Sequence, residues 1–176
     1  MSAAHRQCSR AVLAFGLLSA VSLGGCGFHL EDAGTLPAAA TMTYIDAANA
    51  HTEFYGYLRD ALRARGVQVV ESRQEAGAVL RILEDSTGQR MLSVSAQNIP
   101  REFEVFYAVT FSFESEGESP IEAQSLVATR SYTYDETLVL GKSLEETELR
   151  EALAEDLARQ ILRRIEANSG RVVAVQ

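Results

Sequence analysis

The sequence predicts an α+β fold, a two-layer sandwich with two main helices packed on one face of a mostly antiparallel sheet of four to five strands. Two observations predict this fold, and a third indicates that the chain does not span a membrane. Residues 103–113 alternate apolar and other side chains, which is typical of a strand with one buried face. Two other segments repeat apolar residues every three or four positions, which indicates helices with a single apolar stripe. No apolar run reaches the roughly 20 residues needed to cross a bilayer.

The first 25 residues differ from the rest of the chain and predict a lipoprotein signal peptide. They carry no acid, and Arg6 and Arg10 precede an uncharged apolar run at residues 11–23. The sequence Leu23-Gly24-Gly25-Cys26 matches the bacterial lipobox, in which small residues admit the chain to a peptidase and the cysteine thiol carries diacylglycerol. We therefore expect cleavage before Cys26 and a diacylglycerol and an N-acyl chain on that residue.

Cys26 would be the only cysteine of the mature chain, because Cys8 lies in the signal. Neither an internal disulfide nor a cysteine metal site could then form. The alternative is that Cys26 is a small buried hydrophobe or half of a disulfide. Several acyl chains, at about 0.8 kcal/mol per buried methylene, would anchor the protein durably. Gly27 stands where Asp often marks inner-membrane retention in enterobacterial lipoproteins, so we expect anchoring on the periplasmic side of the outer membrane.

The mature chain is expected to be one domain on a tether. Residues 26–40 form the lipidated end and the tether, residues 41–168 the α+β domain, and residues 169–176 a short tail. Loss of residues 1–25 with their two arginines takes the net charge from -8 to -10. Because a nucleic-acid-binding surface needs clustered positive charge, nucleic acid is excluded as a partner.

The first part of the domain is expected to contain a strand and a helix. Residues 41–45 alternate apolar and polar side chains. From Thr52 to Arg65 apolar residues recur at helical spacing, and Gly66 then offers the left-handed conformation at which helices commonly end. Further β-prone segments are residues 67–70, 78–83 and 91–96. Turns are expected at residues 85–88, 98–100 and 117–120.

A further strand is expected at residues 126–134, where Arg130, Tyr132 and Tyr134 fall on one face. Each predicted helix carries one apolar stripe, so both helices can bury their stripes against the same face of the sheet. The other face, with Arg81 and Arg130, is expected to be free for water or a partner.

The last helix is expected to begin at Ser143. Ser143 and Glu146 have the spacing of a capping box, in which each side chain satisfies a free backbone N–H at the helix start. Leucine and isoleucine then recur every four residues from 149 to 165. Asn168 and Gly170 are expected to end the helix.

The sequence contains no recognisable catalytic motif, and we expect no enzyme activity. His29 and His51 have neither metal-ligand nor general-base spacing. The triplet at residues 141–143 (Gly-Lys-Ser) resembles the end of a phosphate loop, but Glu136 stands where that loop needs glycine. The triplet does precede a predicted helix start, where an anion can be held.

Several segments together resemble the LptE family of lipopolysaccharide-assembly lipoproteins. Their order and spacing match the family over nearly the whole mature chain. The segments are residues 26–30 (CGFHL), 44–46 (YID), 101–104 (REFE), 130–135 (RSYTYD), 139–142 (VLGK) and 145–146 (EE).

The resemblance implies a non-enzymatic outer-membrane protein that sits as a plug inside the β-barrel of LptD, helps it fold, and binds lipopolysaccharide during export. It needs no cofactor apart from the lipid on Cys26. A family lysine in the loop before the last helix contributes to lipopolysaccharide binding, and Lys142 matches it. A second basic residue has no counterpart in this register, and Arg101 or Arg90 is the nearest substitute.

Alternative interpretations remain for these residues and for the function. Lys142 is alternatively a solvated lysine. Arg130, Tyr132 and Tyr134 are candidates for the partner interface, although Arg130 is also placed to pair with an acid, and the tyrosines to serve in packing. The protein is alternatively another outer-membrane lipoprotein scaffold, such as an accessory of the barrel-insertion machinery, or a periplasmic hydrolase whose catalytic residues the sequence does not reveal.

Overall fold

The computed structural model describes residues 36–135 and 137–173. The chain divides into two compact units, Met1–Ala33 and Gly34–Gln176, and the described residues belong to the second. The expected signal peptide, Cys26 and most of the tether therefore lie outside the described residues. Among the described residues, no helix has the length and apolar character to cross a membrane.

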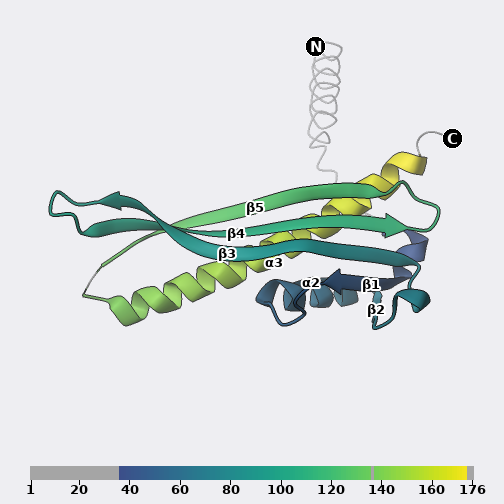
Figure 1. Cartoon of the computed structure of the whole chain (residues 1–176), viewed down its shortest axis with the longest axis horizontal. Coiled ribbons are helices and arrows are strands. Elements are labelled where there is room, and N and C mark those ends of the chain that lie inside the picture. Colours follow the sequence, from purple (N-terminus) through teal and green to yellow (C-terminus); the bar gives the residue numbers. More distant parts are fainter. Residues whose placement is uncertain (1–35, 136, 174–176) are drawn as a thin grey trace, which may run out of the picture. The chain divides into compact units, whose positions relative to one another are not determined.

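One mixed sheet of five strands organises the second unit, in the order β2-β1-β3-β4-β5 (Figure 1). Strand β1 runs parallel to β2 and β3, whereas the longer β3–β4 and β4–β5 pairs are antiparallel. The strands are β1 (Met42–Ala47), β2 (Gln68–Val70), β3 (Ala78–Val94), β4 (Pro100–Ser115) and β5 (Ile121–Thr133).

Two helices cover one face of this sheet, which confirms the predicted α+β fold. Helix α2 spans Glu53–Ala64 and contacts α3, which spans Val139–Val173 and also contacts β4 and β5. In Figure 1 the strands pass in front of α3, and no described helix covers the opposite face of the sheet, here called the uncovered face. Two short 3-10 helices, η1 (Ala38–Thr41) and η2 (Arg73–Glu75), complete the described elements.

Helix α2 forms as its sequence predicts. The Thr52 hydroxyl accepts a hydrogen bond of 3.2 Å from the backbone N–H of Tyr55, which caps the first turn. Phe54 and Leu58 have no exposed surface, so the predicted stripe faces the core. Gly66 has a φ of 79°, a left-handed conformation that glycine adopts without a Cβ penalty.

The core lies between the helices and the inner face of the sheet. Val105, Val109 and Phe111 of β4 are completely buried, as the alternation at residues 103–113 predicts. Leu157 and Ile161 of α3 meet them with no exposed surface. The free energy of burying these side chains is what holds α3 along the antiparallel part of the sheet.

The expected turn at residues 85–88 is wrong, because β3 continues through it to Val94. Fifteen of the seventeen residues of β3 pair with β4, and this long ladder outweighs the local turn preference. Gly88 lets the Phe106 ring lie against the β3 backbone, since a Cβ at that position would lie 2.9 Å from the ring and would displace it. The chain reverses after β3 at the expected interruption near residue 98, where Asn98 has a φ of 63°.

A β-bulge at Leu83 changes which side chains of β3 face the helices. The register shifts between Ile82 and Glu84, so Leu83 is an extra residue with 57% of its surface exposed. Before the bulge, Ile82 faces the core. After it, Asp85 lies opposite the buried Val109 and therefore also points to the helix side.

Helix α3 is longer at both ends than expected. It begins at Val139, and the backbone N–H of Lys142 donates to Leu138 O at 3.0 Å, so Ser143 lies inside the helix and the predicted capping box is wrong. The helix also continues past Asn168 to Val173. Asn168 is held there because its side-chain amide donates to Ser119 O, in the β4–β5 turn, at 2.9 Å.

Asp85 joins the sheet to the start of α2. The Thr52 hydroxyl donates to one carboxylate oxygen at 2.5 Å, and the Tyr107 hydroxyl donates to the other at 2.8 Å. Thr52 is also the residue that caps α2. The bulge at Leu83 is what turns this carboxylate toward the helix.

Replacing Tyr107 by phenylalanine should lower the free energy of unfolding by about 1 kcal/mol at neutral pH. Burial, and then the hydrogen bond to Asp85 and its charge, raise the pKa of Tyr107 above its ordinary value of 10.0. Because the folded-state pKa is raised, the stabilisation is complete below about pH 10 and is lost as pH rises further. Urea unfolding between pH 7 and 11 should therefore give a steeper alkaline loss for the wild type than for Tyr107→Phe.

Candidate functional site

A cavity of about 460 Å³ lies between the β3–β4 hairpin and the first turns of α3. Figure 1 shows these elements diverging at the left of the view. The volume falls within the roughly 300–1,000 Å³ that is typical of small-ligand sites. The lining residues are Gln89, Ile99, Pro100, Phe103, Tyr132, Tyr134, Lys142, Ser143 and Glu146. Three residues singled out in the sequence, Lys142, Tyr132 and Tyr134, are thus brought together.

Lys142 is held inside the first turn of α3 and is not a loop residue. Its side chain is 20% exposed, and its Nζ lies 2.7 Å from Glu145 Oε2. The same Nζ lies 6.0 Å from the centroid of the Tyr132 ring, at the outer limit of a cation–π contact. Lys142 is therefore a positioned cation, and an anion that binds it must compete with Glu145.

Three aromatic rings line the side of the cavity that faces Lys142. Phe103 stacks on Tyr132 at a centroid distance of 5.8 Å and meets Tyr134 edge-on at 5.4 Å. The Tyr132 hydroxyl donates to Gln89 Oε1 at 3.0 Å. Burial, and then the charges of Glu146 and Glu145, raise the pKa of Tyr132. Its phenol is therefore neutral at physiological pH, and the wall is uncharged.

Arg101 lies at the same end of the sheet as Lys142. The Arg101 carbonyl oxygen accepts a hydrogen bond of 2.9 Å from the backbone N–H of Tyr134. Arg101 itself is exposed. Hydrogen bonds from the side chain and backbone of Thr137 lower the pKa of Asp135, and the charges of Lys142 and Arg101 lower it further. The positive charges of Lys142 and Arg101 therefore both stabilise the ionised form of the Asp135 carboxylate.

Arg90 does not reach this cavity. It lies opposite Glu104 in the β3–β4 register, and its guanidinium pairs with that carboxylate at 2.5 Å. Since Phe103 and Val105 face the helices, Glu104 and Arg90 point to the uncovered face. The structure thus separates the two basic residues proposed as substitutes and brings only Arg101 toward Lys142.

Arg130 lies on the opposite face from the one expected. It pairs with Val105 in the β4–β5 register, which places it on the helix side, and its guanidinium lies 3.6 Å from Asp156 of α3. The expectation that Arg130 shares a free sheet face with Arg81 is therefore wrong. Arg81 does lie on the uncovered face, 3.0 Å from Glu114.

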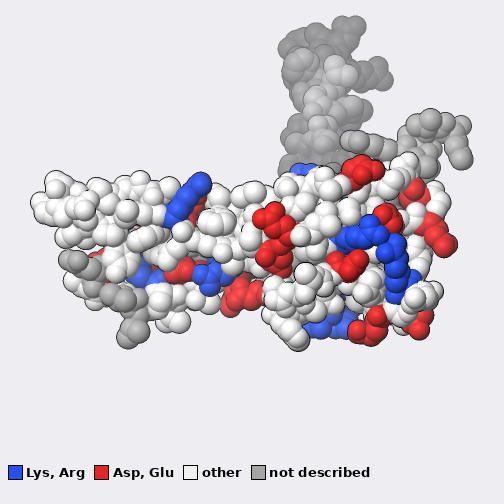
Figure 2. Space-filling view, viewed as in Figure 1, with Lys and Arg blue, Asp and Glu red and all other residues white. Residues whose placement is uncertain are grey.

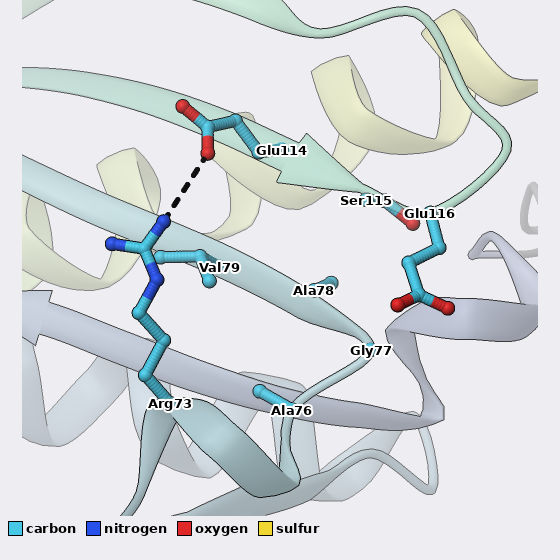
Figure 3. Close-up of a pocket in the computed structure, with 8 residues that line it drawn as sticks. All are labelled: Arg73, Ala76, Gly77, Ala78, Val79, Glu114, Ser115 and Glu116. Carbon is cyan, nitrogen blue, oxygen red and sulfur yellow. Dashed lines mark ion pairs between the residues drawn. The ribbon is translucent and has the colours of Figure 1, made fainter.

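A second pocket, of about 250 Å³, lies at the other end of the β3–β4 ladder (Figure 3). Arg73 of η2 and Glu114 of β4 form an ion pair of 3.6 Å across it. Figure 2 shows that charges of both signs gather over this end of the sheet, whereas the hairpin end is largely uncharged. Because Glu114 is paired with Arg81 as well as Arg73, these three charged side chains are joined by ion pairs.

The described part of the chain contains no group of three or more metal-binding side chains that could hold a metal ion. His51 is exposed before α2, and His29 lies outside the described residues. The cavity beside Lys142 is the candidate site, and the lysine and aromatic rings in its lining are suited to binding a ligand.

Sequence reasoning missed three contributors to this cavity. The sequence patterns place Gln89 in no strand, give Phe103 a position in the core strand and in a segment that resembles the family, and give Glu145 a position only in such a segment. Gln89 and Phe103 contact Tyr132, which is distant in sequence, and Glu145 meets Lys142 because the two lie three residues apart on one helix. The alternation of residues 103–113 was the one signal that could have placed Phe103 on the same face as Tyr132.

Comparisons with known proteins identify the family. The LptE family, described as lipopolysaccharide-assembly, matches residues 39–165 of this chain. The chain is also 24% identical over 150 residues to the LPS-assembly lipoprotein LptE of Pectobacterium atrosepticum, covering 84% of this chain and 80% of that protein. The family match includes all of the described strands and most of α3.

Solved structures agree with this match. The solution structure of lipoprotein B from Nitrosomonas europaea has a TM-score of 0.67 at 26% identity, covering 82% of this chain and 93% of that one. The crystal structure of a minor lipoprotein from Acinetobacter baumannii has a TM-score of 0.60 at 29% identity, covering 76% and 96%. Rare lipoprotein B from Shewanella oneidensis shares the fold, with a TM-score of 0.66 at 23% identity, covering 74% and 98%. The chain belongs to the LptE family, the non-enzymatic outer-membrane lipoproteins of lipopolysaccharide assembly.

Proposed function

We propose that this protein binds lipopolysaccharide during its export while it plugs the β-barrel of LptD and assists the assembly of that barrel. Acyl chains on Cys26 would hold it at the periplasmic side of the outer membrane. The observation that carries the binding proposal is the position of Lys142, a largely buried cation on the wall of a cavity. A lysine ammonium serves as a point charge for a phosphate group.

The surroundings of Lys142 support an anionic ligand despite the acidic chain. The net charge of -10 expected for the mature chain repels anions at long range, but exposed charges beyond about 8 Å are largely screened at physiological salt. Within that distance the positive end of the α3 dipole adds to the lysine charge. Arg101 provides a second cation near Asp135. Lys142 and Arg101 are therefore the cations that a phosphate would engage at this end of the domain, in competition with Glu145 and Asp135.

The uncovered face of β4 and β5 supports the plug proposal. Val127 of β5 exposes 63% of its surface there, opposite Ala108, and the Glu104 and Glu114 carboxylates of β4 are paired with arginines of β3. Arg130 and Tyr132 are engaged by α3 and by Gln89 within the domain, so we do not carry them forward as barrel contacts. An uncovered sheet face that carries both apolar residues and paired charges suits a large protein interface.

Photo-crosslinking in native membranes tests both halves of the proposal. A photoreactive residue at Val127 should crosslink to LptD, and one at Tyr134, beside the cavity, should crosslink to lipopolysaccharide. Glu151, exposed on α3, provides a matched position on the helix side of the sheet, where we expect less barrel crosslinking. Crosslinks from Val127 to the barrel-insertion machinery alone would favour the scaffold alternative. Extraction of the protein as a lone monomer would contradict the plug.

A further inference from the structure

We infer that the cavity beside Lys142 takes a hydrocarbon chain, so that the site recognises an anionic amphiphile: its phosphate lies on Lys142 and one alkyl chain lies between the aromatic rings and the hairpin. This inference rests on the proposed function, because it specifies which part of the ligand each wall contacts. The α3 side of the cavity carries Lys142 together with Glu146, which pairs with Arg150, and the sheet side is mostly apolar.

The apolar side is continuous. Phe103 contacts both Tyr132 and Tyr134, so the three rings form one surface. Ile99 and Pro100 extend it toward the hairpin, and both are only half-buried. These side chains offer a phosphate no cationic partner, whereas burying them against methylenes is favourable.

Exposed apolar residues are concentrated on the elements that border this cavity. Among the described residues, eight large hydrophobic side chains are exposed, and five of them lie here. Met91, Leu92 and Val94 belong to the end of β3, and Leu138 and Leu144 to the start of α3, with exposures of 45% to 66%. Clustered exposed apolar surface of this kind marks a binding site.

The charge pattern selects an amphiphile over a free anion. Residues 91–100, which form the hairpin, contain no charged side chain, and the corresponding end of the domain is largely uncharged in Figure 2. Lys142 is the cation on the opposite, α3 side of the cavity, and Arg101 follows Pro100 on β4 outside the lining. A sugar phosphate would engage the cations and leave the rings exposed, but a phosphorylated lipid engages both sides.

A chain-length series of alkyl phosphates tests this inference. The probes are butyl, octyl and dodecyl phosphate, each kept below its critical micelle concentration, with binding measured by calorimetry. The protein is the chain from residue 26 onward, carrying Cys26→Ala so that no acyl chain of its own can enter. Since each buried methylene contributes about 0.8 kcal/mol, octyl phosphate should bind at least about tenfold more tightly than butyl phosphate.

Paired substitutions locate the alkyl chain. Ile99→Ser, within the cavity wall, should reduce the preference for octyl over butyl phosphate severalfold, whereas Val127→Ser, on the uncovered sheet face, should leave it unchanged. If Ile99→Ser fails to fold, the chain-length series on the parent protein still decides. Equal affinities for all three probes, or no binding of any, would overturn the inference.

The outcomes separate this inference from the proposed function. Lipopolysaccharide binding that depends on Lys142, without any dependence on alkyl chain length, would remove the hydrocarbon subsite and leave the proposed function standing. Chain-length-dependent binding of alkyl phosphates, without lipopolysaccharide binding, would support the subsite and remove the proposed ligand.

Discussion

Lys142→Glu should weaken lipopolysaccharide binding at least about tenfold while the domain stays folded. The substitution removes the cation and places a further carboxylate beside Glu145 and Glu146, so any phosphate is repelled. An acid in the first turn of a helix is favourable with respect to the helix dipole, and α3 should therefore still form. Binding of purified lipopolysaccharide to the purified protein, with circular dichroism as the folding check, measures the effect.

Two further variants make the Lys142 result specific. Arg90→Glu reverses a charge on the uncovered face, where the Arg90 side chain is 65% exposed, and should leave binding unchanged. Glu145→Gln removes the carboxylate that competes for Lys142 and should strengthen binding. Equal losses in Lys142→Glu and Arg90→Glu would mean that only overall charge matters and would remove the cavity from the proposed site.

Phe111→Ala should lower the free energy of unfolding by about 3–5 kcal/mol. Phe111 has no exposed surface and lies opposite Ile82 of β3 and Gln124 of β5, so its removal leaves a cavity beneath the centre of the sheet. A domain of this kind has a total stability of about 5–15 kcal/mol, and this loss is a large part of it. Urea unfolding followed by circular dichroism measures the change.

The matched control for the core prediction is Val127→Ala. It deletes apolar atoms from a neighbouring strand at a position that is 63% exposed, and it should change stability by no more than about 0.5 kcal/mol. A loss below about 1 kcal/mol for Phe111→Ala would show that the core collapses around the missing ring. Reduced recovery of LptD barrels with Phe111→Ala would link folding of this domain to barrel assembly.

Elements that depend on a local pattern could be predicted from the sequence. Helix α2 follows from its apolar spacing and from Gly66, and both are present, whereas the Thr52 cap is seen only in the structure. The buried face of β4 follows from strict alternation, because each buried side chain there is two residues from the next. These features need no knowledge of the partner element.

Features that depend on pairing between distant segments could not be predicted. The polar residues after Asp85 resemble a turn, but an extended ladder with β4 supplies their backbone hydrogen bonds. The bulge at Leu83 exists only relative to β4, and so does the face on which Asp85 lies. Arg130 was assigned to the wrong face because the face covered by α3 is decided by packing.

The candidate site was predictable only in part. Lys142 was identified by resemblance and as a residue before a helix, whereas the helix begins earlier and includes it. The residues opposite it, Phe103 and Gln89, come from strands whose register the sequence does not specify. A cavity between a hairpin and a helix start is a product of tertiary structure.

The position of Lys142 within a hydrogen-bonded turn has a consequence for how fast and how tightly an anion can be captured. Its backbone is fixed when the domain folds, so capture requires only that the methylenes of one side chain rotate away from Glu145. A lysine on a mobile loop would also lose backbone entropy, at roughly 1–2 kcal/mol for each residue that becomes ordered. The ligand therefore meets a receptor whose main chain is already in its bound arrangement.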